Sequence, residues 1–493
     1  MKNKRVVYNL VSSITYRIVV MVLSFLISHI YLVNFGSEVN GVVSTIKQVF
    51  SYLSLLEAGV GLASTQALYG PVANEDKGKI NGILSATNYF YRRTGFLYGS
   101  LVIGVGLLYS VFIKSEVDSL TIFLLTVIYG MPGVLRFWIV GKYRVLLEVE
   151  GKGYVVNYLA MFSEVFSSLL RVFLLYTCDS LVIIQSIYCL DSIIQVCFFF
   201  FYIRKNYKWL NFRVKPNFGA ISQKGAVLIH QVSGVVFSNT DVFLLSLMCD
   251  FKTVSVYTVY NLFYHQSEVL LSMVTSGISF RLGQMYQVNK EKFEKVFSVY
   301  QGLFTVLIFT GYSLFEILLI PIVKIYTGGV SDANYLDSKL LTLIVLVGLL
   351  SGIKYPLTQV ISFSGDFKNT EKYAVIEMVL NISLSVILIK IFGIYGGLLG
   401  TIIALVYRYI VTLRFVYMNI LKNGLKVVGY RLLAFFAVFV LICSRINPLC
   451  FIEKGVLEVV FLLIKYGVVF GGVYLCLDVI CNFRNIVGIV RRN

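Results

Sequence analysis

One apolar stretch, from Lys224 to Asp250, carries an unusual number of polar side chains for so hydrophobic a segment. Its polar members include His230, Gln231, Asn239 and Asp241. On a helix of about 3.6 residues per turn, the face of Asp241 also carries His230, Gly234 and Ser238. A carboxylate in a membrane-spanning helix costs roughly 2.5–3.5 kcal/mol on insertion scales, so Asp241 should face water or a partner. A partner that serves only helix packing would also satisfy Asp241, and both alternatives stay open.

Three further stretches carry polar side chains at helical spacing. The first contains Ser13, Arg17, Ser24, Ser28 and Tyr31, and the second contains Lys47, Ser51, Ser54, Gly61 and Thr65, with Glu57 at the edge of the stripe. The third contains Tyr257, Asn261, Tyr264, His265, Glu268, Ser272, Thr275 and Ser279. Because lipid cannot satisfy such faces, all four stretches are expected to turn inward on a shared water-filled cavity. Ser, Thr and Gly alone would also suit close helix packing, but the charged members suit it poorly.

The side chains predicted to line this cavity and bind its cargo are Arg17, Lys47, Glu57, His230, Gln231, Asp241, Asn261, His265 and Glu268. Four other cations are predicted to lie near helix ends, where long side chains reach the membrane interface: Arg136, Arg171, Lys390 and Arg408. Glu164 and Arg171 are seven residues apart on one helix face, so they could also form one network. The deeper charges have no assigned role: Asp191, Lys354, Glu377 and Lys465.

The composition indicates a membrane protein and excludes several classes of site. Of the 493 residues, 58% are hydrophobic and only 14% are charged, which favours lipid over water as the solvent. The eight cysteines form no CxxC pair, so neither a zinc site nor a disulfide framework is predicted. The three histidines lack the HExxH spacing of zinc hydrolases. No nucleophile–base pair is visible, and the chain is not expected to be an enzyme or to need a cofactor.

The hydrophobicity profile predicts an all-α polytopic membrane protein with about fourteen spans. The predicted spans are 9–33, 41–69, 94–113, 119–141, 154–177, 180–203, 225–249, 253–280, 297–320, 340–363, 373–392, 394–414, 431–447 and 455–481. Several connections are very short, such as those at Cys178 and Gly393, which predicts that the helices they join are antiparallel neighbours.

Most of the Lys and Arg residues fall in alternate loops, on the side that also holds both termini. Positive loops face the cytoplasm, so both termini are predicted to be cytoplasmic. The same asymmetry accounts for most of the net charge of +18, and no nucleic-acid partner is needed to explain it.

The longest positive loop, residues 204–224, divides the predicted spans into six and eight. We therefore expect a first lobe of helices 1–6 over residues 1–203 and a second lobe of helices 7–12 over residues 225–420. Residues 421–493 would add helices 13 and 14 and a cytoplasmic tail. An even number of helices per lobe gives both lobes the same orientation, as in parallel repeats.

Three segments share sequence motifs with a known family of proteins. The segment from Asn34 reads NFGSEVNGVVSTIKQVFSYLSLLEAGVGLASTQALYGPV, with a Phe-Gly turn, an acidic residue and a Gly-x-Gly. The segments from Ser238 (SNTDVFLLSLMCDFKTVSVYTVYNL) and from Tyr355 (YPLTQVISFSGDFKNTEKYAVIEMVLNISLSVILIKIFGIYGGLLGTIIA) are similar in the same way. This order of segments is similar to that of O-antigen and capsule repeat-unit flippases, in the multidrug/oligosaccharidyl-lipid/polysaccharide (MOP) exporter superfamily.

The resemblance implies two six-helix lobes in a V shape, as in MATE transporters, around a cavity lined by helices 1, 2, 7 and 8. It implies a lipid-linked cargo, an undecaprenyl-pyrophosphate glycan repeat unit, that crosses the bacterial inner membrane by alternating access. Arg17 and Lys47 would then contact the pyrophosphate, since a diphosphate at low dielectric needs cationic donors. Asp241 and Glu268 would shape the cavity or couple transport to protons or sodium ions. Membrane lipids, a polysaccharide polymerase and glycosyltransferases would be its partners.

Two other functions are compatible with parts of the pattern. A cation-coupled multidrug exporter of the same superfamily would need an acidic cavity, and Arg17 and Lys47 disfavour that cargo. A membrane glycan polymerase or ligase would need a large extracytoplasmic catalytic loop. The longest loop on that side runs only from Pro321 to Lys339.

Overall fold

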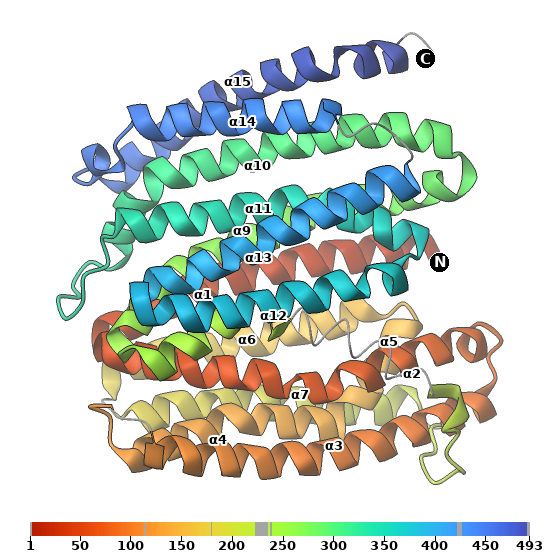
Figure 1. Ribbon diagram of the computed structural model, residues 1–493. Coiled ribbons are helices and arrows are strands. Elements are labelled where there is room, and N and C mark those ends of the chain that lie inside the picture. Colours follow the sequence, from red (N-terminus) through yellow and green to blue (C-terminus); the bar gives the residue numbers. More distant parts are fainter. Residues whose placement is uncertain are drawn as a thin grey trace. The chain divides into compact units, whose positions relative to one another are not determined.

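The computed structural model describes residues 2–112, 115–178, 180–221, 235–236, 239–421 and 426–490, and these ranges contain helices and no strand. They divide into two compact units, Met1–Ser246 (unit 1) and Leu247–Asn493 (unit 2). Residues 222–234 lie outside the described residues. They comprise the end of the predicted loop 204–224 and the start of the predicted span 225–249. In each unit the long helices run side by side (Figure 1).

Unit 1 consists mainly of helices from the first half of the chain. They are α1 (Lys2–Leu53), α2 (Leu55–Ala73), α3 (Lys77–Phe112), α4 (Ser119–Leu135), a π-helical turn η1 (Arg136–Val140), α5 (Gly141–Val149), α6 (Gly153–Thr177), α7 (Leu181–Asn206) and a short 3₁₀ turn η2 (Gly219–Ile221). A last helical segment, 239–248, crosses from unit 1 into unit 2. Helix α1 packs on α6, and α4 packs on both α3 and α7.

Helix α1 is interrupted at the turn that the sequence predicts. Gly36 has φ 76° and ψ 179°, a conformation that is open essentially only to glycine. Helix α1 continues after Gly36 and ends at Leu53. One residue, Ser54, separates it from α2. The predicted span 41–69 is therefore two helical pieces, with Ser54 between them.

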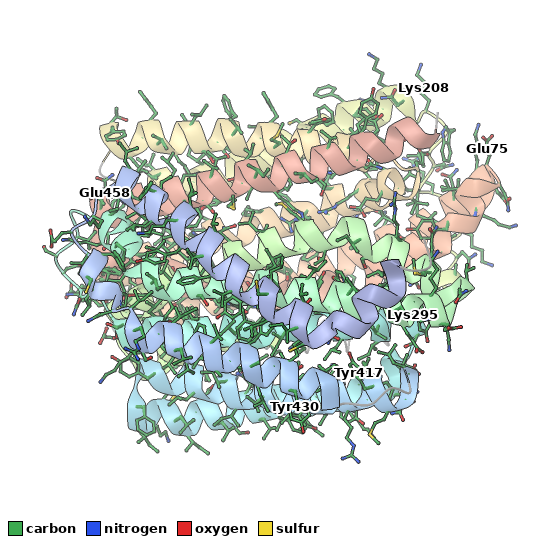
Figure 2. The ribbon with its side chains drawn as sticks, turned by 90° about the horizontal axis from the view of Figure 1, so that it is seen from above. Glu75, Lys208, Lys295, Tyr417, Tyr430 and Glu458 are labelled. Atoms are coloured by element: carbon green, nitrogen blue, oxygen red, sulfur yellow. The ribbon has the colours of Figure 1, made fainter. Side chains whose placement is uncertain are left out.

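Polar contacts connect several loops at one end of unit 1. The Asn9 amide donates to the carbonyl oxygen of Gly151 at 3.1 Å and accepts from the Tyr154 N–H at 2.7 Å. The hydroxyl of Tyr207 donates to Glu150 at 2.5 Å and accepts from the Lys152 ammonium at 2.7 Å. The start of α1, the α5–α6 turn and the segment after α7 therefore share this end, and Figure 2 shows Glu75 and Lys208 there too.

Unit 2 is built from the remaining helices. They are α9 (Phe251–Val288), α10 (Lys290–Tyr326), α11 (Ser338–Ser364), α12 (Phe367–Phe392), α13 (Ile394–Phe415), a π-helical turn η3 (Val416–Ile420), α14 (Lys426–Arg445), a 3₁₀ turn η4 (Pro448–Phe451) and α15 (Val456–Val490). Helix α11 packs on α9, α10 and α13, and α15 packs along α10.

The short connections join antiparallel neighbours, as predicted: α6 packs on α7, and α12 packs on α13. Between α12 and α13, Gly393 makes the turn at φ 56°. The two helices then approach closely at two glycines. A Cβ at Gly396 would overlap the carbonyl group of Leu388, and a Cβ at Gly400 would lie 2.5 Å from the Ser385 hydroxyl.

The outer surface is apolar over most of the helices. Large exposed side chains include Phe96 (71% exposed), Val111 (73%), Tyr176 (75%), Leu457 (86%) and Ile480 (73%). Water would not stabilise so much exposed apolar surface, whereas hydrocarbon does. Among the described residues, eleven helices are long and apolar enough to cross a membrane. The chain is a multi-pass, all-α membrane protein.

The predicted spans without a separate match among these eleven are 41–69, 225–249 and 253–280. Much of 225–249 lies outside the described residues. The other two stretches are helical, but both carry the polar stripes noted in the sequence. In α9 the polar stripe lowers the mean hydropathy. The first part of 41–69 belongs to the long helix α1, which continues past Gly36, and it is therefore included in the span Val11–Leu53.

We expect Gly396→Ala to lower the melting temperature of the purified protein in detergent. The new methyl group would push α12 and α13 apart, and overpacking of this kind costs about 1–3 kcal/mol. The matched control is Gly472→Ala on α15, where a Cβ meets no atom within 4 Å and alanine favours the helix. Equal melting temperatures for the two variants would contradict the close approach at Gly396.

Candidate functional site

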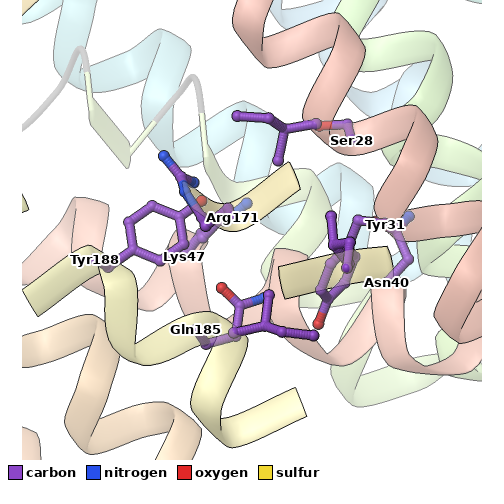
Figure 3. A pocket seen from close by; sticks show the side chains of 10 residues that line it. Ser28, Tyr31, Asn40, Lys47, Arg171, Gln185 and Tyr188 are labelled. Carbon is purple, nitrogen blue, oxygen red and sulfur yellow. The ribbon is translucent and has the colours of Figure 1, made fainter. Parts of the chain in front are cut away.

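A small polar cavity lies inside unit 1. Helix α1 lines it on both sides of the Gly36 break, and α6 and α7 complete the wall. The lining residues are Ile27, Ser28, Tyr31, Asn40, Lys47, Arg171, Leu175, Ile184, Gln185 and Tyr188. Its volume is about 20 Å³, and Figure 3 shows Lys47, Arg171 and Tyr188 grouped together on one side.

Two cations share one aromatic ring in this cavity. The Arg171 guanidinium lies 4.2 Å from the centroid of the Tyr188 ring, and the Lys47 ammonium lies 5.9 Å from the same centroid. Lys47 is also 5.6 Å from the Tyr129 ring, whose hydroxyl donates to Gln185 at 2.9 Å. The negative ring faces attract both cations and hold two positive charges close together.

One carboxylate compensates part of this charge. The Glu164 Oε1 atom lies 2.9 Å from the Arg171 guanidinium, whose residue is only 3% exposed. Ser168 bonds both groups, at 3.3 Å from Glu164 and 3.2 Å from Arg171. No described carboxylate lies within ion-pair distance of Lys47, so the cluster of Lys47, Arg171 and Glu164 has one net positive charge.

The buried Arg171 also keeps an unused donor: within the described part of the chain its Nε atom has no hydrogen-bond partner. An unsatisfied buried donor is costly, by about 1–3 kcal/mol or more for a charged group. The arrangement can therefore bind an anion through one free guanidinium donor and the Lys47 ammonium, which is exposed.

The interface position predicted for Arg171 is wrong, because the side chain is buried against Glu164 and Tyr188. The alternative network of Glu164 with Arg171 is confirmed. Periodicity could place these two residues on one face, but it could not identify α7 and α1 as the helices that oppose it. Tyr129, Gln185 and Tyr188 were not predicted, since isolated aromatic and amide residues in an apolar run carry no distinctive spacing.

The other predicted residues of unit 1 lie outside this cavity or cannot be placed. Arg17 is exposed on α1, about three turns before Ser28, and does not line the cavity. Glu57 lies near the start of α2, but its side chain is outside the described residues, as are His230 and Gln231. Asp241 is buried, at 8% exposure, in the helical segment 239–248.

This helical segment packs against the end of α1 within unit 1. The Gln48 amide donates to Asn239, and the Tyr52 and Thr240 hydroxyls are 3.1 Å apart. The Tyr52 and Phe243 rings meet edge to face at 6.0 Å. The buried position of Asp241 therefore lies one residue beyond a polar contact with α1, the helix that carries Lys47.

In unit 2, the predicted residues Asn261, His265 and Glu268 lie on one face of α9. Asn261 and Glu268 are half-buried, and His265 is exposed. The Glu268 Oε1 atom is buried and has no hydrogen-bond partner among the described residues. None of the described contacts of unit 2 assigns these three residues to a ligand.

Two side chains of the α9 stripe form hydrogen bonds within unit 2 instead of facing a cavity. The Tyr264 hydroxyl donates to Ser351 at 3.3 Å, and the Thr275 hydroxyl donates to that of Tyr355 at 3.2 Å. Both partners lie on α11, so these two members of the stripe serve helix packing, as the alternative explanation of such stripes requires.

One charge network of unit 2 joins three helices. Glu377 on α12 lies 2.9 Å from the Lys354 ammonium of α11 and 3.5 Å from the Arg408 guanidinium of α13. Arg408 also donates to the carbonyl oxygen of Thr370 at 3.3 Å. The interface position predicted for Arg408 is wrong, since its side chain is only 12% exposed. Arg136 and Lys390 are exposed, and their position at the membrane interface stays a prediction.

Structural comparison identifies transporters with the same fold. An inward-facing multidrug resistance MATE family transporter of the MOP superfamily superposes with a TM-score of 0.68 at 16% identity, covering 84% of this chain and 99% of the transporter. The lipid II flippase MurJ, in an inward closed conformation, has a TM-score of 0.68 at 15% identity, covering 98% of this chain and 100% of the flippase.

A MOP superfamily transporter from Pyrococcus furiosus, whose binding pocket is described as reversed in polarity, has a TM-score of 0.55 at 15% identity and covers 85% of this chain and 97% of the transporter. No protein-family profile and no curated protein sequence matches the chain.

We expect Glu377→Gln to destabilise the protein strongly. The change would remove the carboxylate that the largely buried Lys354 and Arg408 share, and removal of one partner from a buried pair costs about 3–5 kcal/mol. The control is Glu291→Gln, which removes an exposed partner of Lys295, a pair worth about 0.3–0.5 kcal/mol. Thermal unfolding in detergent compares them, and similar melting temperatures would contradict a structural role for the network.

The arrangement of helices, rather than any sequence match, thus relates this chain to known proteins: it has the fold of MOP superfamily transporters and flippases.

Proposed function

We propose that the chain is a flippase for lipid-linked oligosaccharide repeat units, carried as undecaprenyl-pyrophosphate glycans across the bacterial inner membrane for O-antigen, capsule or exopolysaccharide synthesis. The observation that carries the proposal is the pair of cations on the Tyr188 ring of unit 1. A diphosphate has more negative charge than one cation can balance, and it needs such donors where water is scarce.

The cavity is too small to enclose a diphosphate, so the cargo would first meet the exposed Lys47 side chain. Arg171 lies behind Lys47 on the same ring and would hold the complementary charge. Glu164 orients the Arg171 guanidinium from the far side of the network. In this arrangement the protein changes no covalent bond; it supplies a polar route for the head group while the lipid tail stays in hydrocarbon.

The breadth of the structural similarity also favours a flippase. The similarity to the lipid II flippase extends over almost the entire chain, whereas the MATE transporters leave part of it unmatched. A cation-coupled multidrug exporter, the second candidate, would bind cationic drugs, and the positive cluster around Tyr188 repels them. The asymmetry of Lys and Arg places both termini in the cytoplasm under this proposal.

We expect Lys47→Gln to reduce translocation of repeat units roughly tenfold or more, because a charge-assisted contact is worth about 1.5–3 kcal/mol. Lys47→Arg should restore it, since it keeps the charge. Membrane-impermeant labelling would show repeat units retained in the cytoplasmic leaflet, and surface glycan would fall accordingly. A further variant, Arg17→Ala, tests the predicted contact of Arg17 with the pyrophosphate, because Arg17 lies outside the cavity.

Arg144→Gln is the matched control, because it removes one exposed charge from unit 1 outside the cavity. Normal surface glycan in membrane-inserted Lys47→Gln and Arg171→Gln variants would rule out the proposed cargo contact. Increased drug susceptibility after deletion of the gene, with intact surface glycan, would support the exporter instead.

A further inference from the structure

A second cavity, lined by polar and apolar side chains, lies at the loop-bearing end of unit 1, apart from the cation pair on Tyr188. It is formed where the segment after α7, residues 207–221, lies along the first half of α3. Hydrogen bonds from α3 attach the segment. Asn81 donates to the Trp209 carbonyl and accepts from the Asn211 N–H, Ser85 lies within hydrogen-bond distance of the Phe212 and Val214 carbonyls, and the Asn217 N–H donates to the Gly82 carbonyl. The segment is thus a fixed part of unit 1.

The cavity has a volume of about 530 Å³, within the usual range for small-ligand sites. Its walls come from α3 and from the attached segment. They consist of Ser85, Asn88, Tyr89, Arg92, Arg93, Phe212, Val214 and Pro216. None of these residues is acidic.

Three cations surround the cavity. Arg92 and Arg93 line it directly, and no described carboxylate lies within ion-pair distance of either. Lys142 donates to Asn88 at 2.7 Å and lies 4.8 Å from the centroid of the Phe212 ring. The Trp138 indole N–H donates to the backbone carbonyl of Arg92, so this contact does not involve the Arg92 guanidinium. Arginine is the residue best suited to bind phosphate through two parallel hydrogen bonds.

The position of the two arginines along α3 indicates the kind of anion. One helical turn further on, Phe96 is 71% exposed and Leu97 is 49% exposed, each on the same face as the arginine four residues earlier. Exposed apolar side chains continue toward Val111, whereas the exposed residues at the start of the helix, such as Lys79, are polar. Arg92 and Arg93 therefore mark the level at which α3 leaves the hydrocarbon.

The length of α3 agrees with this level. Its 36 residues extend about 54 Å, whereas the hydrocarbon core is about 30 Å thick. The first part of α3 must project beyond the membrane, and it is this part that carries the attached segment. The aromatic ring of Tyr89, which meets Phe218 edge to face at 5.3 Å, lies at the same boundary, where such rings prefer to be.

We propose that this cavity binds the phosphate head group of an anionic membrane phospholipid. Arg92 and Arg93 would bind the phosphodiester, the polar floor around Asn88 would receive the head-group hydroxyls, and the acyl chains would lie along Phe96 and Leu97. The orientation proposed above places this lipid in the cytoplasmic leaflet. Bound there, the lipid would brace the attached segment, residues 207–221, against α3.

The test uses the full-length protein, stripped of lipid in detergent and titrated with phosphatidylglycerol or phosphatidylcholine of identical acyl chains, with native mass spectrometry as readout. We expect a clear preference for phosphatidylglycerol. The double variant Arg92→Gln, Arg93→Gln should reduce binding of this lipid roughly 10- to 30-fold, given about 1 kcal/mol per basic residue at a membrane surface.

The control double variant is Arg144→Gln, Lys208→Gln, which removes two exposed charges of unit 1 outside the cavity. It should bind phosphatidylglycerol as the unchanged protein does. An equal loss in both double variants, or no preference between the two lipids, would overturn the site. Displacement of the lipid by inorganic phosphate alone would show that the cavity recognises free phosphate and would overturn the lipid assignment.

Size-exclusion chromatography and circular dichroism confirm that the variants are folded before the titration. Should the double variant fail this check, Arg93→Gln alone is expected to give a partial loss, and unchanged binding would count against the proposal. No glycan cargo is present in the assay, so its outcome is independent of whether the chain proves to be a flippase.

Discussion

Charge inside hydrocarbon must be compensated, and this requirement explains the most informative contacts of the molecule. In unit 2 the compensation is internal. Glu377 lies between Lys354 and Arg408, and Arg431 on α14 lies 3.6 Å from Asp478 on α15 with both side chains almost fully buried. Each of these contacts joins two consecutive helices of unit 2, so the pairs fix how those helices pack together as well as lowering the cost of burial.

In unit 1 the same requirement is met only in part. Glu164 compensates Arg171, while Lys47 depends on aromatic ring faces for its described contacts. Ring faces attract a cation but do not neutralise it. Lys354 and Arg408 both contact Glu377, whereas no described carboxylate lies within ion-pair distance of Lys47. This difference is the reason for proposing an anionic head group as cargo.

The fold itself does not choose the cargo. An inward-facing MATE transporter and the lipid II flippase superpose on this chain equally well, each at a TM-score of 0.68, although their names describe different activities. A third neighbour is described as having a reversed pocket polarity that suggests a different function. Function within this architecture depends on the side chains placed in the cavities, and in unit 1 these are cationic and aromatic.

The sequence by itself determined the class of the protein, the positions of most helices and the tight turns. Apolar runs of membrane length, the glycines at positions 36 and 393 and the alternation of positive loops are local features, and local features can be read from periodicity and composition. The sequence also predicted that Lys47 lines a cavity, and Lys47 is part of the lining in unit 1. It placed Glu164 and Arg171 on one helix face.

Only the tertiary structure decided which of the polar faces meet. It buried Arg171 and Arg408, which lie near helix ends in sequence, because each has a carboxylate within ion-pair distance: Glu164 on the same helix for Arg171, and Glu377 on α12 for Arg408. It turned Tyr264 and Thr275 toward α11 and left Arg17 outside the cavity around Tyr188. Helical periodicity specifies the direction of a side chain around its own axis, but the identity of the neighbouring helix depends on packing between segments that are distant in the chain.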